Sequence, residues 1–547
     1  MTAARPPAEV RGLRRHLPSL VAVVPLVVAG IRAVKDHWYP IGDNAYFALR
    51  ARDVGTVDHP LLGTWTSASH SAGVRMNNPG PLLFDELALP ARLSVSWGVV
   101  LGVVLLAVAS VVVAVHFARR IGGQPAAWAV ALAFVGLEWS MGSAILIEPW
   151  QPHALLLPFL CFLVLVWAMV AGEAGAMPWA AGVASLIVET HLSYALIVPG
   201  LAVVGLAGLL VMVHRTNGVG RRWPALRGPL LATAVVLVLA WSQPLVDQVA
   251  DTGNLATVAT HGTAGNERSV GPRLAGRILA SVVAVPGGWS QQGYARVHEA
   301  GDPHAAVPLV GLAGPGAAKA WALALGVALV AAAVVAARRR SREWLSALFA
   351  VAAALSLGFV TLGLLPINDQ LLLGAHQVRF LWPVAWFTLA VLLGTFVSLV
   401  RRATVVTVGA AVLVMALALP AHNPHTGPSD QVSAIPIVRS LLAQLEGVDL
   451  RGPVLVDLSV SVFPEPYSTP VMLDLQRRGV DFVVDGEAVA QVGDHREHHP
   501  GDPVTAVLRV VDGDAARHPE AGWKRVAYVP GSTPFTTAAV LLKEGGP

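Results

Sequence analysis

Residues 97–171 read WGVVLGVVLLAVASVVVAVHFARRIGGQPAAWAVALAFVGLEWSMGSAILIEPWQPHALLLPFLCFLVLVWAMVA and contain three apolar runs, at 97–117, 125–145 and 153–171. Each run has about 20 residues, the length with which an α-helix crosses the hydrocarbon core of a bilayer. Arg119 and Arg120 separate the first two runs, and the polar segment IEPWQPH separates the second from the third. This pattern predicts consecutive membrane-spanning helices joined by short loops on alternate sides of the membrane.

Similar apolar runs flank this stretch, near 17–34, 177–190, 194–213, 228–246, 316–337, 344–365, 377–399 and 403–420. We therefore expect an α-helical polytopic membrane protein with about eleven transmembrane helices. At about 1.5 Å per residue, 177–213 is too long for one straight span, and Glu189 to His191 interrupt it. Two short spans are expected there. The first run could serve as a signal peptide, but the many later spans favour an uncleaved anchor.

The composition excludes several classes of protein. The chain has 547 residues, of which 54% are hydrophobic and 13% are charged, whereas a typical soluble protein has about 25% charged residues. An ordinary cytosolic enzyme, a disordered protein and a nucleic-acid binder are therefore excluded. The single cysteine, Cys161, lies in an apolar run, so neither an internal disulfide nor a zinc site built from cysteines is expected.

The arginines give the expected orientation. With the N-terminus in the cytoplasm, the internal segments carry sixteen of them, at positions 5, 11, 14, 15, 119, 120, 215, 221, 222, 227, 338, 339, 340, 342, 401 and 402. The short external turns at 146–152, 189–193 and 366–376 carry no lysine or arginine. This asymmetry follows the positive-inside rule. Eleven spans then predict a multi-pass cell-membrane protein with an extracytoplasmic C-terminal region.

Charge and hydropathy also divide the chain into domains. Up to residue 420 there are 28 basic and 18 acidic residues, and after it 10 basic and 16 acidic ones. We expect a transmembrane domain at 1–420 with long external loops at 35–96 and 247–315, a linker at 421–430 and an external domain at 431–547. Strand-like segments such as GPVLVDLSVSV and VTAVLRVVDG alternate there with the helix-like segment TPVMLDLQRRG, which predicts a small α/β domain.

The polar residues gather at the predicted external ends of the spans. Ionisable side chains are costly at membrane depth and tend to face a cavity or a site. Those of the external ends include Asp43, Asn78, Glu148, His153, His191, Tyr194, Asn368, Asp369, His376 and Arg379. The internal loops contain little besides arginine. This difference predicts a functional site at the external membrane face.

Each of these residues has a structural alternative. Asp43 could be a helix N-cap, Glu148 a solvated loop carboxylate, and His191 a hydrogen-bonded turn residue. His376 and Arg379 could contact lipid headgroups, and the segment NNPGP is a turn by composition, in which Asn77 could have no further role. The tryptophans near the span ends, among them Trp38, Trp139, Trp150 and Trp382, are typical of an aromatic belt.

The segment IGDNAYFALRARDV (41–54) resembles the acidic first-loop segment of the GT-C superfamily of polytopic glycosyltransferases. The resemblance covers roughly residues 15–420, and the long first loop and external domain are similar to those of actinobacterial cell-envelope members. It implies an inverting enzyme that moves arabinofuranose, mannose or a similar sugar from a polyprenyl-phosphate donor to a glycan, lipid or protein acceptor. Asp43 takes the acidic position. The second position is Asn44, which departs from the carboxylate pair of the family.

On this resemblance Asp43 is the expected catalytic base, since a carboxylate can take the proton of the acceptor hydroxyl. Arg379 is the expected ligand of the donor phosphate, because a guanidinium binds phosphate through two parallel hydrogen bonds. His376 would assist it, with Arg50, Arg52 and Arg75 as weaker phosphate ligands. The residues expected to line the sugar or acceptor pocket are Asn78, Glu148, His153, His191 and Tyr194.

The need for a cofactor is left open. Asp43, Glu148, His153 and His191 are suitable ligand types for a divalent metal, but nothing in their spacing demands one. Two other functions are weighed against the enzyme. A transporter or lipid flippase is disfavoured because repeated halves are absent and the charges lie at the external ends. A non-catalytic scaffold for the cell envelope would need no convergent polar site.

Overall fold

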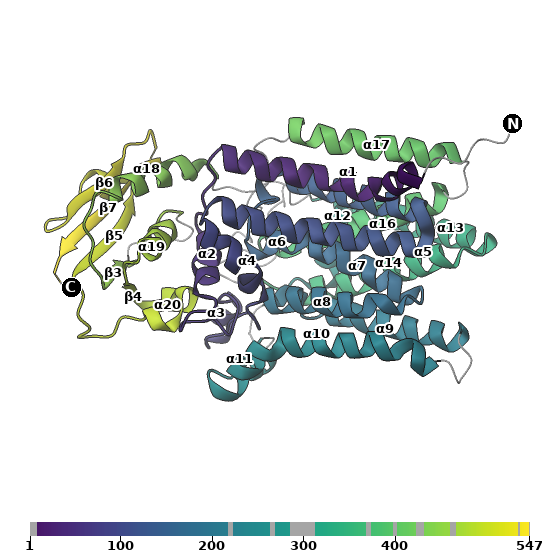
Figure 1. Ribbon diagram of the computed structural model, residues 1–547, viewed down its shortest axis with the longest axis horizontal. Coiled ribbons are helices and arrows are strands. Elements are labelled where there is room, and N and C mark those ends of the chain that lie inside the picture. Colours follow the sequence, from purple (N-terminus) through teal and green to yellow (C-terminus); the bar gives the residue numbers. More distant parts are fainter. Residues whose placement is uncertain are drawn as a thin grey trace.

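The computed structural model describes residues 8–216, 222–262, 268–284, 312–367, 373–397, 402–422, 432–459, 466–533 and 536–545. Most of the expected linker and much of the external loop 247–315 lie outside these residues. The molecule is elongated, with a bundle of long helices and a small sheet domain at one end of it (Figure 1). The first described helix, α1 (Ala8–Lys35), begins at the opposite end of the bundle from this domain (Figure 1).

The bundle is built from apolar helices: α1 (Ala8–Lys35), α5 (Trp97–Ile145), α6 (Gln151–Ala154), α7 (Leu156–Val170), α8 (Met177–Thr190), α9 (Ile197–Thr216), α10 (Arg222–Ala250), α12 (Gly271–Ala284), α13 (Pro315–Arg338), α14 (Arg342–Leu364), α16 (Leu381–Val397) and α17 (Arg402–His422). In the described part of the chain, seven helices are long and apolar enough to cross a membrane. Every residue of α7 is buried, so α7 lies inside the bundle. The polytopic helical fold is confirmed, and the number of eleven spans stays a prediction.

The long helix α5 turns back on itself at Gly122–Gly123, where the backbone leaves the helical region and Gly123 has φ 66°. At the start of α5, Gly98 lies against the carbonyl of Pro90 in the first loop. Beyond its other end, the backbone amide of Trp150 binds Asn44 of the same loop. Both ends of α5 therefore lie beside the first loop, as expected for two separate spans. The stretch 177–213 is likewise divided, between α8 and α9, by the short helix η2 (Leu192–Tyr194).

The loop between α1 and α5 contains α2 (Asp43–Asp53), α3 (Ala68–Ala72) and α4 (Leu82–Leu93). These helices and α11 (Asn254–His261) lie at the end of the bundle that faces the sheet domain (Figure 1). Phe47 of α2 packs against Phe84 of α4, with the ring centroids 5.5 Å apart. Gly42 is the N-cap residue of α2 and has φ 51°, which suits glycine. The N-cap interpretation of Asp43 is wrong, because Asp43 is the first residue of the helix.

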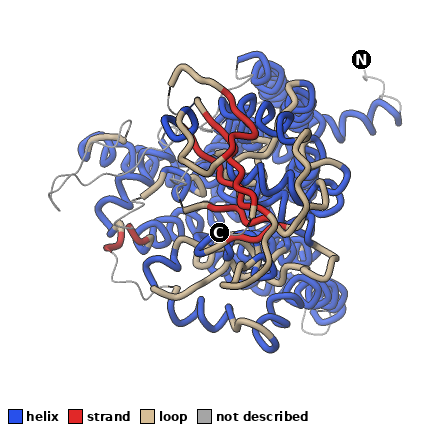
Figure 2. Tube along the Cα trace, turned by 90° about the vertical axis from the view of Figure 1, so that its left-hand side faces the viewer, coloured by secondary structure: helices blue, strands red, loops and turns tan. Residues whose placement is uncertain are grey.

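The C-terminal domain contains a five-stranded sheet in the order β4-β3-β5-β7-β6, which lies across the end of the helical bundle (Figure 2). Its strands are β3 (Val454–Asp457), β4 (Phe482–Val484), β5 (Ala506–Asp512), β6 (Lys524–Val529) and β7 (Ala538–Glu544). β3 pairs in parallel with β4 and β5, while β7 is antiparallel to β5 and β6. The helices α18 (Ile435–Leu445) and α19 (Ser468–Arg477) accompany the sheet. The strand β7 is an element that the sequence analysis did not predict.

Candidate active site

Three of the expected site residues form one buried chain of hydrogen bonds. Nη1 of Arg379 lies 2.6 Å from Nε2 of His153, and Nδ1 of His153 lies 2.7 Å from Oε2 of Glu148. A guanidinium can only donate, so Nε2 of His153 is the acceptor in this arrangement. Nδ1 then carries the hydrogen and donates it to the Glu148 carboxylate. The three side chains are 2–3% exposed.

These hydrogen bonds offset the free-energy cost of burying the charged guanidinium of Arg379. A buried charge is costly unless it is paired and hydrogen-bonded. The carboxylate of Glu148 balances the charge of Arg379, and the neutral imidazole of His153 joins them. Cζ of Arg379 also lies 5.4 Å from the ring centroid of Trp382, a cation–π distance. The planar guanidinium is therefore held in one orientation at the end of α15 (Ala375–Val378).

The start of α2 lies beside this buried chain. The side-chain oxygen of Asn44 accepts a hydrogen bond of 3.1 Å from the backbone amide of Trp150. The ring centroid of Trp150 is 4.8 Å from that of His153 and 5.0 Å from that of His376. Asp43, the residue before Asn44, is thus held at the same end of the bundle as Arg379. Trp150 packs between two histidines, although the sequence had favoured an aromatic belt for it.

Asn78 ties the first loop to the turn between α8 and α9. Its Nδ2 donates to the carbonyl and the hydroxyl of Thr64, at 3.0 Å each, and its Oδ1 accepts 3.0 Å from the backbone amide of Leu192. The hydroxyl of Thr64 also lies 3.2 Å from Nε2 of Gln151. The buried Asn78 therefore joins two stretches of the first loop to the turn that contains Leu192.

His191 and Tyr194 complete this set of contacts. Nδ1 of His191 accepts a hydrogen bond of 3.2 Å from the amide of Ser193, as the turn interpretation predicts. The centroid of its ring is 6.2 Å from that of Tyr194, and Tyr194 is 6.2 Å from Phe380, the neighbour of Arg379. Through Tyr194 and Phe380, His191 is therefore connected to the segment that carries Arg379. The expected site residues gather at one end of the bundle, while Asn368 and Asp369 lie outside the described residues.

The carboxyl group of Asp43 has the electrostatics of a base. Burial raises its pKa from the ordinary value to about 6, because desolvation disfavours the charged form. Its place in the first turn of α2 puts it near the positive end of the helix dipole, which favours the carboxylate. A base with a pKa just below neutrality is ionised at pH 7 and still accepts a proton readily.

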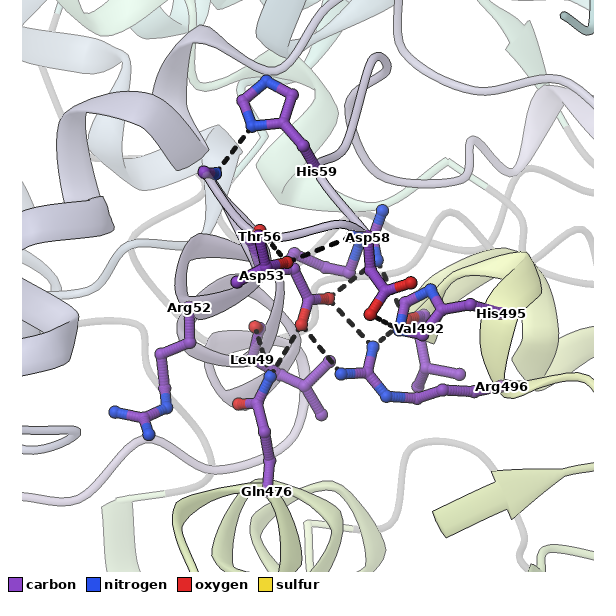
Figure 3. A network of polar contacts seen from close by, with 12 residues as sticks. Leu49, Arg52, Asp53, Thr56, Asp58, His59, Gln476, Val492, His495 and Arg496 are labelled. Carbon is purple, nitrogen blue, oxygen red and sulfur yellow. Dashed lines mark hydrogen bonds and ion pairs between the residues drawn. The ribbon is translucent and has the colours of Figure 1, made fainter. Parts of the chain in front are cut away.

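The other end of α2 is fixed to the C-terminal domain through Asp53, a carboxylate only 4% exposed (Figure 3). Arg496 donates to both of its oxygens, at 2.8 and 2.9 Å, and Gln476 of α19 and Arg50 each add a bond of 2.8 Å. Nε2 of Gln476 also contacts the carbonyl of Leu49 at 3.2 Å. The C-terminal domain therefore holds the helix that begins with Asp43.

The arginines of the first loop bind protein groups. Arg50 bonds Asp53, Arg52 donates to the carbonyl of Ala91 at 3.3 Å, and Arg75 pairs with Asp494 of the C-terminal domain at 2.6 Å. These contacts hold the loop in place. Arg379 differs from them, because it is buried next to the tryptophan and histidines described above.

The residues considered as metal ligands are arranged differently from a metal site. Among the described residues, no three His, Cys, Asp or Glu side chains are placed to hold a metal ion together. Glu148 and His153 are bonded to each other, and His153 is bonded to Arg379. Glu148 and His153 therefore form a hydrogen-bonded chain with Arg379 and are not arranged as metal ligands.

Several residues of this region were missed or misjudged from the sequence. Asn44 was a departure from the family pattern, and Thr64 was not considered. Asp53 was not among the expected site residues, and nothing in the sequence links it to Arg496. The contact of Asn44 with the amide of Trp150 had no signal in the sequence either, because the two residues are 106 positions apart.

Several solved structures are similar to the chain. ArnT from Cupriavidus metallidurans, solved with bound undecaprenyl phosphate, aligns over 96% of this chain and 98% of its own, at 16% identity and a TM-score of 0.43. The apo oligosaccharyltransferase of Archaeoglobus fulgidus aligns over 92% of this chain and 70% of its own, at 11% identity and a TM-score of 0.41. AglB of the same organism, in complex with an inhibitory peptide and a dolichol-phosphate, aligns over 81% and 62%, at 12% identity and a TM-score of 0.38.

No protein-family model and no curated protein matches the chain. The three structural similarities have low identities and low TM-scores, so the function is inferred from the residues of the site and their contacts.

Asp53 and Asp494 each form an ion pair between the first loop and the C-terminal domain. Removing these two carboxylates should lower the free energy of unfolding by different amounts. Asp53→Ala leaves Arg496 buried without its partner and should cost about 3–5 kcal/mol of stability. Asp494→Ala removes a partner of Arg75 from a largely exposed pair and should cost about 1 kcal/mol or less. Urea unfolding of the purified variants in detergent measures both. Equal losses would contradict the role assigned to Asp53.

Proposed function

We propose that this protein is a membrane glycosyltransferase of the GT-C type that uses a polyprenyl-phosphate-linked sugar. One observation carries the proposal: Asp43, a carboxylate with a pKa of about 6, and the buried Arg379 lie at the same end of the bundle. They are linked through the hydrogen bond between Asn44 and Trp150 and the edge-to-face contact of Trp150 with His153. A base and a phosphate ligand on neighbouring elements are what this reaction requires.

The proposed reaction is a single displacement at the anomeric carbon. The acceptor hydroxyl attacks this carbon while Asp43 takes its proton. The bond from the anomeric carbon to the phosphate oxygen breaks, and the lipid phosphate leaves with the electron pair. Arg379 stabilises the charge that develops on this phosphate. Since one carboxylate acts as base and no covalent intermediate forms, the anomeric configuration is inverted.

The remaining residues would bind and orient the substrates. His376, next to Trp150, assists with the lipid phosphate, and Asn78, His191 and Tyr194 line the place of the sugar or acceptor. Glu148 and His153 act through Arg379 by fixing its orientation. The sugar would be arabinofuranose, mannose or a similar pentose or hexose, and the acceptor a glycan, lipid or protein of the cell envelope. A scaffold gives no reason for these polar groups to converge.

The first test of this proposal is Asp43→Asn, which removes the base but keeps the shape of the side chain. Purified protein in nanodiscs is given a panel of polyprenyl-phosphate sugars, and sugar release or transfer is measured. The variant should lose at least about 100-fold in rate, the usual share of a general base. In the wild type, activity should fall as the pH is lowered through about 6, because Asp43 then becomes protonated. Undiminished turnover by the variant would refute the assignment of the base.

The second test concerns the phosphate. Arg379→Lys keeps a positive charge but loses the planar pair of donors, and Arg379→Ala loses both. We expect binding of a polyprenyl phosphate to weaken in both, by about 10- to 100-fold for alanine, the share of a charge-assisted hydrogen bond. Arg75→Ala, a first-loop arginine paired with Asp494, is the matched control and should bind normally. Unchanged affinity in Arg379→Ala would move the phosphate site elsewhere.

The external location of the site can be tested with cysteine labels. The sole cysteine, Cys161, is buried, so an introduced cysteine gives the signal. Asp514→Cys in the C-terminal domain should react with a membrane-impermeant maleimide on spheroplasts. Arg339→Cys, between α13 and α14 at the other end of the bundle, should react only after the membrane is opened. The reverse pattern would place the site at the cytoplasmic face.

A further inference from the structure

A separate cavity of about 330 Å³ lies where the first loop, the α10–α11 corner and the C-terminal domain meet. Its walls are the first-loop segment 57–64 with Arg75 and Asn77, residues 247–257 in part, and residues near α20 (Val489–Val492) and η6 (Asp494–Arg496). Its volume is at the lower end of the range for small-molecule sites. Arg50 and Arg75, expected from the sequence as weaker phosphate ligands, are among its lining residues, whereas Asp43, Arg379 and the other expected site residues are not.

The charge of the cavity is negative. Four aspartates line it, Asp58, Asp247, Asp251 and Asp494, together with two arginines, Arg50 and Arg75. Each arginine is paired with a carboxylate, Arg50 with Asp53 and Arg75 with Asp494. The excess of carboxylates disfavours a phosphate, so the donor headgroup is better accommodated next to Arg379.

Two carboxylates of the cavity remain available to a ligand. Asp58 is 4.0 Å from Nε2 of His495, a weak contact, and its side chain is 39% exposed (Figure 3). Asp251 directly follows α10 and is exposed, and within the described residues no hydrogen bond or ion pair engages its carboxylate. Asp247, by contrast, is saturated by Thr252 and Asn254. Carboxylates without a strong partner, such as those of Asp58 and Asp251, can accept hydrogen bonds from the hydroxyl groups of a ligand.

The cavity adjoins the candidate active site through a shared wall. Thr64 lines the cavity, and its hydroxyl is also bound by Gln151 and Asn78 of the site. Asn77 lines the cavity and is adjacent in sequence to Asn78. Arg50, another lining residue, belongs to α2, the helix that begins with Asp43. A ligand in the cavity therefore lies next to the elements that carry the base.

We propose that this cavity binds the acceptor, and that the acceptor is a neutral, hydroxyl-rich saccharide. Asp58 and Asp251 accept hydrogen bonds from its hydroxyls, and the amide of Gln491 both donates and accepts. The polar walls and modest volume suit a short saccharide rather than a lipid tail. The inference rests on the proposed glycosyltransferase function, whose second substrate it names by chemical class.

The experiment measures binding of soluble saccharides by saturation-transfer NMR to the full-length protein in nanodiscs. The probes are short neutral arabino-, manno- and galacto-oligosaccharides, each also offered in a phosphorylated form. At least one neutral saccharide should bind, and its phosphorylated form should bind more weakly because of the negative lining. Preference for the phosphorylated forms, or no binding of any neutral probe, would overturn the proposal.

The variants Asp58→Asn and Asp251→Asn identify the site of binding. Each should weaken saccharide binding about tenfold, the effect of one charge-assisted hydrogen bond. Both side chains are exposed enough for the fold to tolerate the change, and Gln491→Ala is a third, uncharged variant. The control is Asp514→Asn, an exposed carboxylate of the same domain outside the cavity. Unaltered binding in all three cavity variants would place the saccharide elsewhere.

The failure of this inference is distinguishable from the failure of the proposed function. In the cavity variants, binding of a polyprenyl phosphate should be unchanged, while the KM for the acceptor rises with little change in kcat. If Asp43→Asn retains full turnover but the cavity variants lose the saccharide, the catalytic assignment fails and the binding site stands. If Asp43→Asn is inactive and the cavity variants bind and react normally, the acceptor site is wrong and the enzyme stands.

Discussion

A guanidinium that is only 2% exposed at the end of a membrane bundle has to find a counter-charge and an acceptor. Arg379 finds both through His153 and Glu148, and this requirement fixes much of what surrounds it. His153 belongs to α6, the short helix between α5 and α7, where the chain changes direction. Trp150 then lies against the imidazole, and its amide holds Asn44. The position of α2, and with it Asp43, follows from the burial of a single arginine.

The helical bundle was predictable because a membrane-spanning helix needs only a sufficient length of apolar sequence. About 20 apolar residues make a span, and charged or glycine-rich segments end it, so Arg119, Arg120 and the segment 189–193 marked real turns. The grouping of the site residues was predictable for the same reason, since the ends of spans meet at one membrane face. The C-terminal sheet was predicted in part. Its strand β7 reads AAVLLKE, a short apolar run whose position between β5 and β6 the sequence does not reveal.

The remaining contacts depend on distances in space that no local pattern encodes. Thr64 meets Gln151, and Asp53 meets Arg496, across 87 and 443 residues respectively. Asn44 stands where the GT-C resemblance implies a second carboxylate, so the sequence alone suggests that a catalytic group is missing. In the structure it supplies a hydrogen-bond acceptor to a backbone amide. A single carboxylate at the start of α2 is therefore compatible with an ordered site.

The separation of Asp53 and Arg496 along the chain also has a consequence for biogenesis. Synthesis proceeds from the N-terminus, and domains generally fold as units during it. The helix α2 is synthesised long before its partner arginine leaves the ribosome, because Asp53 and Arg496 are 443 residues apart. Until then Asp53 has no counter-charge from the C-terminal domain, and the helix with Asp43 is held from one side only. The far end of α2 is therefore fixed only when the C-terminal domain is complete and Arg496 reaches Asp53.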